Sequence, residues 1–258
     1  MTNLEKKLQQ ETVKSIQNLV DQKKIGIAFS GGVDSTLLAK IATDLGYDVL
    51  LLTIGFENSH DIKFAQEIAK MLGYKHVVEI ISTKTFPEIA KRIKMIINTD
   101  NLSWLENCTA FYYVSVLAKK YGIKKVLTAN GIDELFCGYN SYRETITHGA
   151  KTVTTMMEKK LDNEIKMMKA VNSITSKFEV HILQPFLSKK FIEFAKKIPL
   201  DEKIHGPDDL TRKHIIRKLA LLSNVPRESA LKRKKALQYG SLIHKNIVKI
   251  RKTWNKIS

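Results

Sequence analysis

The chain has 258 residues, of which 43% are hydrophobic and 27% are charged. This composition is ordinary for a folded domain and excludes a wholly disordered chain. No apolar run approaches the roughly 20 residues needed to cross a bilayer, and the charged N-terminal segment lacks the apolar stretch of a secretory signal. Cys108 and Cys137 form neither a disulfide framework nor a CxxC pair. We therefore expect a cytoplasmic protein with no membrane contact.

The formal net charge of +17 is concentrated near the C-terminus. Residues 210–258 carry fourteen Lys or Arg and one acid, Glu228. Such a stretch is typical of a solvated helical surface, but it also suits a site for anionic nucleotides or a nucleic-acid face. Charge alone does not separate these alternatives.

Apolar spacing predicts alternating helices and strands over the first half of the chain. The helical segments are 1–23, 35–45, 60–72, 86–97 and 104–121, and the strand segments are 25–29, 48–54, 76–81 and 125–128. Alternation of this kind predicts βαβ units and an α/β, Rossmann-like fold with a parallel sheet and flanking helices. Ligands of such sheets bind at the carboxyl ends of the strands, here residues 30–35, 55–59 and 129–138.

After about residue 145 the strand pattern fades. Residues 156–174 predict a long helix, Pro185-Phe186-Leu187 interrupts the pattern, and the remainder predicts shorter helices. We expect one domain over residues 1–258, with a nucleotide-binding core at about 20–145 and a helical C-terminal half at about 146–258.

The most specific motif is Ser30-Gly31-Gly32-Val33-Asp34-Ser35, between a predicted strand and a predicted helix. Glycines allow a tight turn and close approach of a ligand, and successive N–H groups at a helix N-terminus bind phosphate oxygens. Serine hydroxyls add donors, and Asp34 can hold Mg²⁺. No Walker A lysine follows, so the usual P-loop is not indicated.

This motif resembles the pyrophosphate loop of the enzymes that cleave ATP between its α and β phosphates. Further segments are similar, in order, to the synthetase domain of the asparagine synthetase family without its N-terminal glutaminase domain. They are Thr53-Ile54-Gly55-Phe56-Glu57-Asn58-Ser59-His60-Asp61, Leu127-Thr128-Ala129-Asn130-Gly131-Ile132-Asp133-Glu134-Leu135-Phe136-Cys137-Gly138-Tyr139, Pro185-Phe186-Leu187 and Lys232-Arg233-Lys234-Lys235-Ala236-Leu237-Gln238-Tyr239-Gly240. The resemblance implies an adenine nucleotide alpha hydrolase-like fold, with ATP and Mg²⁺ as cofactors.

The resemblance also implies roles for individual residues. Asp34 and Asp133 hold Mg²⁺, and Asp133 also counts among the catalytic residues. Lys235, or Lys234 one position earlier, stabilises charge during acyl transfer. The predicted ATP-binding residues are Ser30, Gly31, Gly32, Val33, Asp34, Ser35, Ile54, Thr128 and Ala129. Plainer alternatives are a helix cap for Asp133, core packing for Ile54 and solvated surface charge for the lysines.

The acceptor half departs from the family pattern. Asn130 stands where the family has an acid, His181 follows Glu179-Val180 where the family has E-x-R, and Ser188 replaces the Asp after P-F-L. We assign Asn130 to the acceptor site. An amide does not take up a proton, so either another group deprotonates the nitrogen nucleophile or the free base is drawn from solution.

The resulting hypothesis is an ATP-dependent carbon–nitrogen ligase that adenylates a carboxylate, aspartate first among candidates, and then amidates it with ammonia. Ammonia comes from solution or from a separate glutaminase subunit, and a homo-oligomer is compatible with the sequence. One alternative is a tRNA-modifying ATP pyrophosphatase, suggested by the basic stretch. The other is a nucleotide-binding protein with a decayed acceptor site.

Overall fold

Five parallel strands form one sheet in the order β3-β2-β1-β4-β5 in the computed structural model, which describes residues 1–232 and 240–254. The strands are β1 (Lys24–Ala28), β2 (Asp48–Gly55), β3 (His76–Ile80), β4 (Lys125–Leu127) and β5 (His181–Leu183). The chain builds outward from β1 to β3 and then returns to the other side of β1. The carboxyl ends of β1 and β4 therefore flank the position where ligands of such sheets bind.

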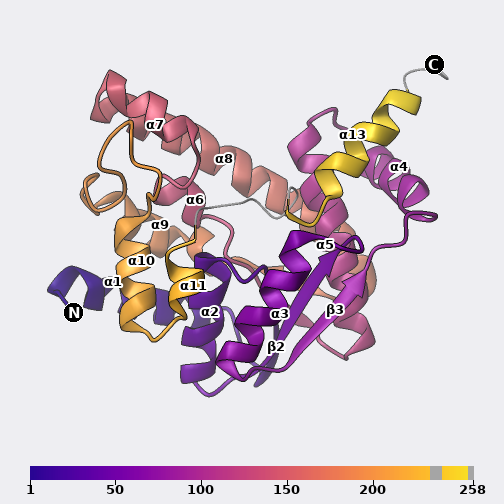
Figure 1. The fold of residues 1–258 in the computed structure, drawn as a ribbon, viewed down its shortest axis with the longest axis horizontal. Helices are drawn as coiled ribbons and strands as arrows, with labels where there is room; N and C mark the ends of the chain where they lie inside the picture. The colour runs from indigo at the N-terminus through magenta and orange to yellow at the C-terminus, as the bar shows by residue number, and fades with distance from the viewer. Residues whose placement is uncertain (233–239, 255–258) are drawn as a thin grey trace.

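Helices cover both faces of the sheet. Their bounds are α1 (Asn3–Gln17), α2 (Val33–Asp44), α3 (His60–Leu72), α4 (Phe86–Ile97), α5 (Leu102–Lys120), α6 (Ile132–Leu135), α7 (Ser141–Thr145), α8 (Ala150–Thr175), α9 (Lys189–Lys196), α10 (His214–Leu222), α11 (Arg227–Ala230) and α13 (Ile243–Trp254). Figure 1 shows α1, α10 and α11 on the left of the view, α4 and α13 on the right, and α8 running across the top.

Alternate side chains of a strand pack into two different hydrophobic cores, because successive side chains point to opposite faces of the sheet. Leu51 of β2 lies in the core that includes α2 and α10, whereas its neighbour Leu52 lies in the core that includes α5 and α8. Both leucines are fully buried. Burial on both faces is what the near-continuous apolar strands predict.

The predicted α/β fold and its parallel sheet are confirmed, with one correction. The sequence pattern predicts no strand after residue 145, but β5 extends the sheet beside β4. The His181 N–H donates to the Lys124 carbonyl at 2.8 Å, and the Thr128 N–H donates to the Leu183 carbonyl at 3.0 Å. A three-residue edge strand that begins with an exposed histidine has too short a pattern to be recognised. No helix in the described part of the chain is long and apolar enough to cross a membrane.

Candidate active site

The glycine loop turns the chain from β1 into α2. Gly31 has a φ of +73°, in the left-handed region that favours glycine. The Ser35 hydroxyl donates to the Gly32 carbonyl at 3.2 Å, which closes the turn. Helix α2 begins at Val33, directly after the glycines. Its first N–H groups have no partner within the helix and form a site suited to phosphate oxygens.

A distant segment supports this loop from behind. Ser229 of α11 is fully buried, and its hydroxyl donates to the Gly31 carbonyl at 2.7 Å. The same oxygen lies 2.9 Å from Oγ1 of Thr36 in α2. The conformation of the loop is therefore coupled to a helix almost 200 residues later in the chain.

Asp34 and Asp133 meet at the carboxyl ends of β1 and β4, on either side of one ammonium group. The Lys213 Nζ lies 2.6 Å from Asp34 Oδ2 and 2.8 Å from Asp133 Oδ1. The Lys213 side chain is 1% exposed, against 17% and 15% for the two carboxylates. Burial lowers the pKa of Lys213, while Asp34 opposes that shift. The two acids are paired through Lys213. The sequence analysis predicts neither this pairing nor a role for Lys213.

Close packing beside Asp133 explains a neighbouring glycine. A Cβ at Gly138 would overlap the Asp133 carboxylate, and the Gly138 N–H donates to the Asp133 carbonyl at 2.8 Å. The Arg212 guanidinium donates to the Gly138 carbonyl at 3.3 Å. The signature loop is thereby joined to the segment that carries Lys213.

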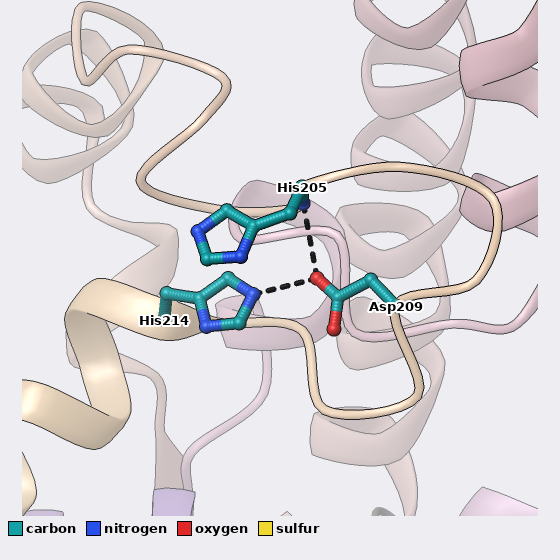
Figure 2. A group of neighbouring side chains, drawn as sticks. All are labelled: His205, Asp209 and His214. Atoms are coloured by element: carbon teal, nitrogen blue, oxygen red, sulfur yellow. Dashed lines mark hydrogen bonds and ion pairs between the residues drawn. The ribbon is translucent and has the colours of Figure 1, made fainter.

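His205, Asp209 and His214 form a cluster in and beside the segment that leads into Lys213 (Figure 2). Asp209 accepts hydrogen bonds from the N–H groups of His205, Thr211 and Arg212 at 2.9 to 3.0 Å, and it lies 2.6 Å from Nε2 of His214. Although burial opposes its charge, these bonds hold the pKa of the Asp209 carboxyl below its usual range.

Two histidines and an aspartate suggest a metal site, but the ring geometry argues against one. The His205 and His214 rings stack with centroids 3.6 Å apart and planes within 5°. An imidazole binds a metal through a lone pair in its ring plane, and one ion does not lie in the planes of two rings that stack face to face in this way. We assign the cluster a structural role in holding the backbone that leads into Lys213.

A cavity of about 530 Å³ opens over the carboxyl ends of the strands. Most of the predicted nucleotide and acceptor residues line it, namely Ser30, Gly32, Val33, Asp34, Ser35, Ile54, Thr128, Ala129, Asn130 and Asp133. Gly31 contributes its carbonyl to Ser229 instead. Ile54 is 1% exposed and belongs to the core as well as to the cavity wall. Core packing and the predicted contact with the nucleotide are therefore compatible at this residue.

Asn130, the residue predicted for the acceptor site, links the segment after β4 to α8. Its Oδ1 accepts from the Thr128 hydroxyl, and its Nδ2 donates to Glu164 Oε1 of α8 at 2.6 Å. Glu134 of α6 accepts from the Tyr139 hydroxyl nearby. Burial raises the pKa of Glu164, and burial together with the charge of Glu164 raises that of Glu134. The sequence analysis missed Glu164, because nothing near it on α8 resembles a motif.

Other departures from the family pattern lie elsewhere. His181 begins β5 and is exposed, and the Ser188 hydroxyl caps α9 by accepting from the Phe191 N–H. Lys234 and Lys235 lie outside the described residues. Lys232, at the start of the same basic run, lines the cavity, with its Nζ 2.9 Å from the centre of the Phe64 ring. At least one lysine of that run therefore reaches the site.

The donor set at Asp34 and Asp133 fits Mg²⁺. Carboxylate oxygens are the protein ligands that this ion prefers, and it commonly takes one or two of them together with phosphate oxygens. Both carboxylates already approach a single positive charge, the Lys213 ammonium, beside the glycine loop. A cation bound here would lie next to the atoms suited to phosphate.

Comparison with known proteins gives one family. The family model described as asparagine synthase matches residues 7–173. A protein of Methanocaldococcus jannaschii named asparagine synthetase 1 (glutamine-hydrolyzing) is 30% identical over 97% of this chain and 51% of its own length. Asparagine synthetase 3 (glutamine-hydrolyzing) of Arabidopsis thaliana is 27% identical over 75% of this chain and 35% of its own length. The chain thus spans about half or less of the length of these relatives.

Among solved structures, NMN synthetase from Francisella tularensis aligns over 91% of this chain and 75% of its own. Its TM-score is 0.48 and its sequence identity is 18%.

Proposed function

The chain belongs to the asparagine synthase family, and from that premise we propose that it is an ATP- and Mg²⁺-dependent amide-forming ligase. It transfers AMP from ATP to a carboxylate, releases pyrophosphate, and then forms an amide with ammonia. The observation that carries the proposal is the pairing of Asp34 and Asp133 beside the glycine loop, at the edge of one cavity. Aspartate is the acceptor that the family points to.

The first step needs an ATP molecule held with its phosphates on the loop. The N–H groups at the start of α2 and the hydroxyls of Ser30 and Ser35 suit pyrophosphate oxygens, and the apolar wall near Ile54 suits an adenine ring. The substrate carboxylate then attacks the α-phosphorus, and the bond to pyrophosphate breaks. Asp34 and Asp133 would hold Mg²⁺, which would supply positive charge beside the phosphates.

The second step needs positive charge near the acyl group. Nitrogen attacks the carbonyl carbon of the acyl-adenylate, and negative charge develops on the carbonyl oxygen before AMP leaves. A lysine directed at that oxygen stabilises it. We assign this role to Lys235, with Lys232 of the same run at the cavity as supporting observation. The reaction is proposed to take place in the cytoplasm, with ammonia from solution or from a separate glutaminase subunit.

The test is the Asp34→Asn variant, measured by ATP–pyrophosphate exchange with aspartate and Mg²⁺. Loss of one of two paired carboxylates should reduce exchange by about 10²-fold or more, because the remaining acid holds the cation poorly. Asp44→Asn, at the exposed end of the same helix, is the matched control and should exchange normally. Normal exchange by Asp34→Asn would place the site elsewhere. Exchange that depends on tRNA and not on aspartate would favour the tRNA-modifying alternative.

A further inference from the structure

Strand β3 forms one edge of the sheet and pairs only with β2 in the part of the chain that the structure describes (Figure 1). Hydrogen bonds of 2.9 and 2.8 Å join the Lys75 carbonyl and the Ile81 N–H to β2. Because the N–H and C=O groups of successive residues point to opposite sides of a strand, those of His76, Val78 and Ile80 point away from β2. These groups are placed to form a ladder with a further strand.

This edge has few of the features that block such pairing. Edge strands are commonly protected by proline, by bulges or by charged side chains. Residues 75–81 contain no proline, and β3 keeps a continuous parallel register with β2. Ile80 is 51% exposed although its side chain is large and apolar. The charged residues are Lys75, whose side chain is 74% exposed, and Glu79, which is half-buried, so the effect of charge depends on what lies opposite them.

Lys75 and Glu79 are complementary to a second copy of the same strand. Antiparallel pairing about a two-fold axis through Val77 places Lys75 of each copy opposite Glu79 of the other, which gives two contacts between opposite charges. Shifting the axis by one residue in either direction sets both charged side chains opposite uncharged residues. The charges therefore favour one register.

The backbone fits the same register. His76 stands opposite Val78 of the second copy, and both residues have backbone groups that point away from β2, as a hydrogen-bonded pair requires. The pairs of Lys75 with Glu79 and of Val77 with Val77 are then the non-hydrogen-bonded pairs, in which side chains approach each other most closely. The opposite charges thus meet where a cross-strand contact is shortest.

Tyr74 stands opposite Ile80 in this register. Tyr74 is half-buried and packs against the core that includes α2 and α10. Cross-strand pairs of an aromatic and a β-branched side chain stabilise a sheet. Pairing of the two strands would therefore cover the exposed apolar side chain at the end of β3.

We propose that this chain forms a two-fold homodimer in which the two copies of β3 pair antiparallel about Val77. The sheets of the two copies continue into one another across the axis. The partner that this edge fits is a second copy of the chain, because the same short segment supplies both members of each charge pair.

Charge reversal tests the register by sedimentation velocity of the full chain at low salt over a series of concentrations. The wild type should dimerise. Lys75→Glu and Glu79→Lys each set two like charges opposite each other and should raise the Kd of the dimer by about 10-fold or more. The double variant restores opposite charges and should return the Kd to near the wild-type value. Lys75 also pairs with Asp48 on the surface at 3.2 Å, a contact whose loss should affect folding little.

Lys7→Glu is the matched control for charge. Lys7 is an exposed residue of α1, and the variant makes the same change in net charge away from β3. Its Kd should equal that of the wild type.

Val78→Pro tests the backbone ladder independently of charge. The Val78 N–H points away from β2, so proline removes a donor to the second copy and leaves the ladder with β2 in place. The variant should be monomeric, with the circular dichroism spectrum of the wild type.

Three results would overturn the proposal. They are a wild type that is monomeric at every concentration, a dimer that Val78→Pro leaves intact, and a double charge variant that associates no better than the single ones. A monomeric wild type would mean that β3 is left open or is covered by a partner of another kind. If Val78→Pro does not fold, the charge series and its double variant decide.

Discussion

Lys213 is the residue whose position says most about the site. It has a φ of +54°, precedes α10, and places its ammonium between two acids from the first turns of α2 and α6. Loops that bind ligands commonly hold residues in such sparsely populated backbone regions. The two carboxylates would otherwise repel each other in a partly buried place, so the Lys213 ammonium holds them together.

Lys213→Met should destabilise the protein, because it leaves two partly buried carboxylates without their shared partner. We expect the free energy of unfolding to fall by about 3 kcal/mol, which lowers the Tm by ~10 °C. Mg²⁺ should raise the Tm of the variant more than that of the wild type, since both carboxylates are then available as ligands. Thermal unfolding followed by circular dichroism, with and without Mg²⁺, measures both effects.

Lys218→Met is the control for this experiment. Lys218 lies on α10, is half-exposed, and pairs with Glu202 at 3.0 Å on the surface. Its loss should change stability by less than ~1 kcal/mol. A Lys213 variant as stable as this control, or one with the same Mg²⁺ response as the wild type, would contradict the role of the shared ammonium.

At the scale of elements, α11 is a four-residue helix whose position depends on tertiary contacts. The Arg217 guanidinium of α10 is 3% exposed and donates to the carbonyls of Ala230 and Lys232 at 2.5 and 3.0 Å. Ser229 then contacts the glycine loop. The glycine loop, α10 and the start of the basic run are therefore fixed relative to one another.

Ser229→Ala should weaken ATP binding, since the Gly31 carbonyl loses its buried donor and the loop relaxes. The expected loss is about 1 kcal/mol, seen as a roughly fivefold increase in the KM for ATP with a smaller change in kcat. Steady-state exchange kinetics measure this. Ser173→Ala, an exposed serine on α8 whose hydroxyl contacts only the carbonyl of Ala170 in the described structure, is the control. A lower kcat with an unchanged KM would argue against a binding role for the contact.

For the whole molecule, the question is whether the two cores behave as one unit. Leu219 of α10 lies in one core and Leu117 of α5 lies in the other, each at most 1% exposed. Strand β2 contributes side chains to both cores, and α10 packs against α1 and against α2, which belongs to the predicted nucleotide-binding core. This arrangement favours one cooperative domain.

Leu219→Ala and Leu117→Ala should each lower the free energy of unfolding by about 3 kcal/mol, from lost burial and the cavity left behind. Each variant should still unfold in a single transition. The unfolding transition followed by circular dichroism should coincide with the transition followed by the fluorescence of Trp104, which lies on α5. Leu222→Ala, at an exposed position on α10, should change little. If the core that contains Leu219 unfolded in Leu219→Ala while the fluorescence of Trp104 stayed at its folded value, the two cores would be separate domains.

The sequence by itself determined the α/β architecture and the place of the glycine loop between β1 and α2. Strand and helix periodicity is local, and it correctly predicted α3 and α4 with their bounds. The glycine loop is likewise a contiguous segment whose chemistry is readable from six residues. The limits appear where periodicity is short: β5 has three residues and forms because β4 offers an unpaired edge.

Only the tertiary structure decided which distant side chains meet. Fourteen Lys and Arg lie in residues 210–258, and nothing in their spacing distinguishes Lys213 as the one buried between Asp34 and Asp133. Glu164 lies 34 residues after Asn130 on a long amphipathic helix, and their contact follows from how α8 packs beside α6. The physical reason is the same in both cases. Burial and charge pairing depend on three-dimensional neighbours, whereas periodicity and turn chemistry depend on the adjacent chain.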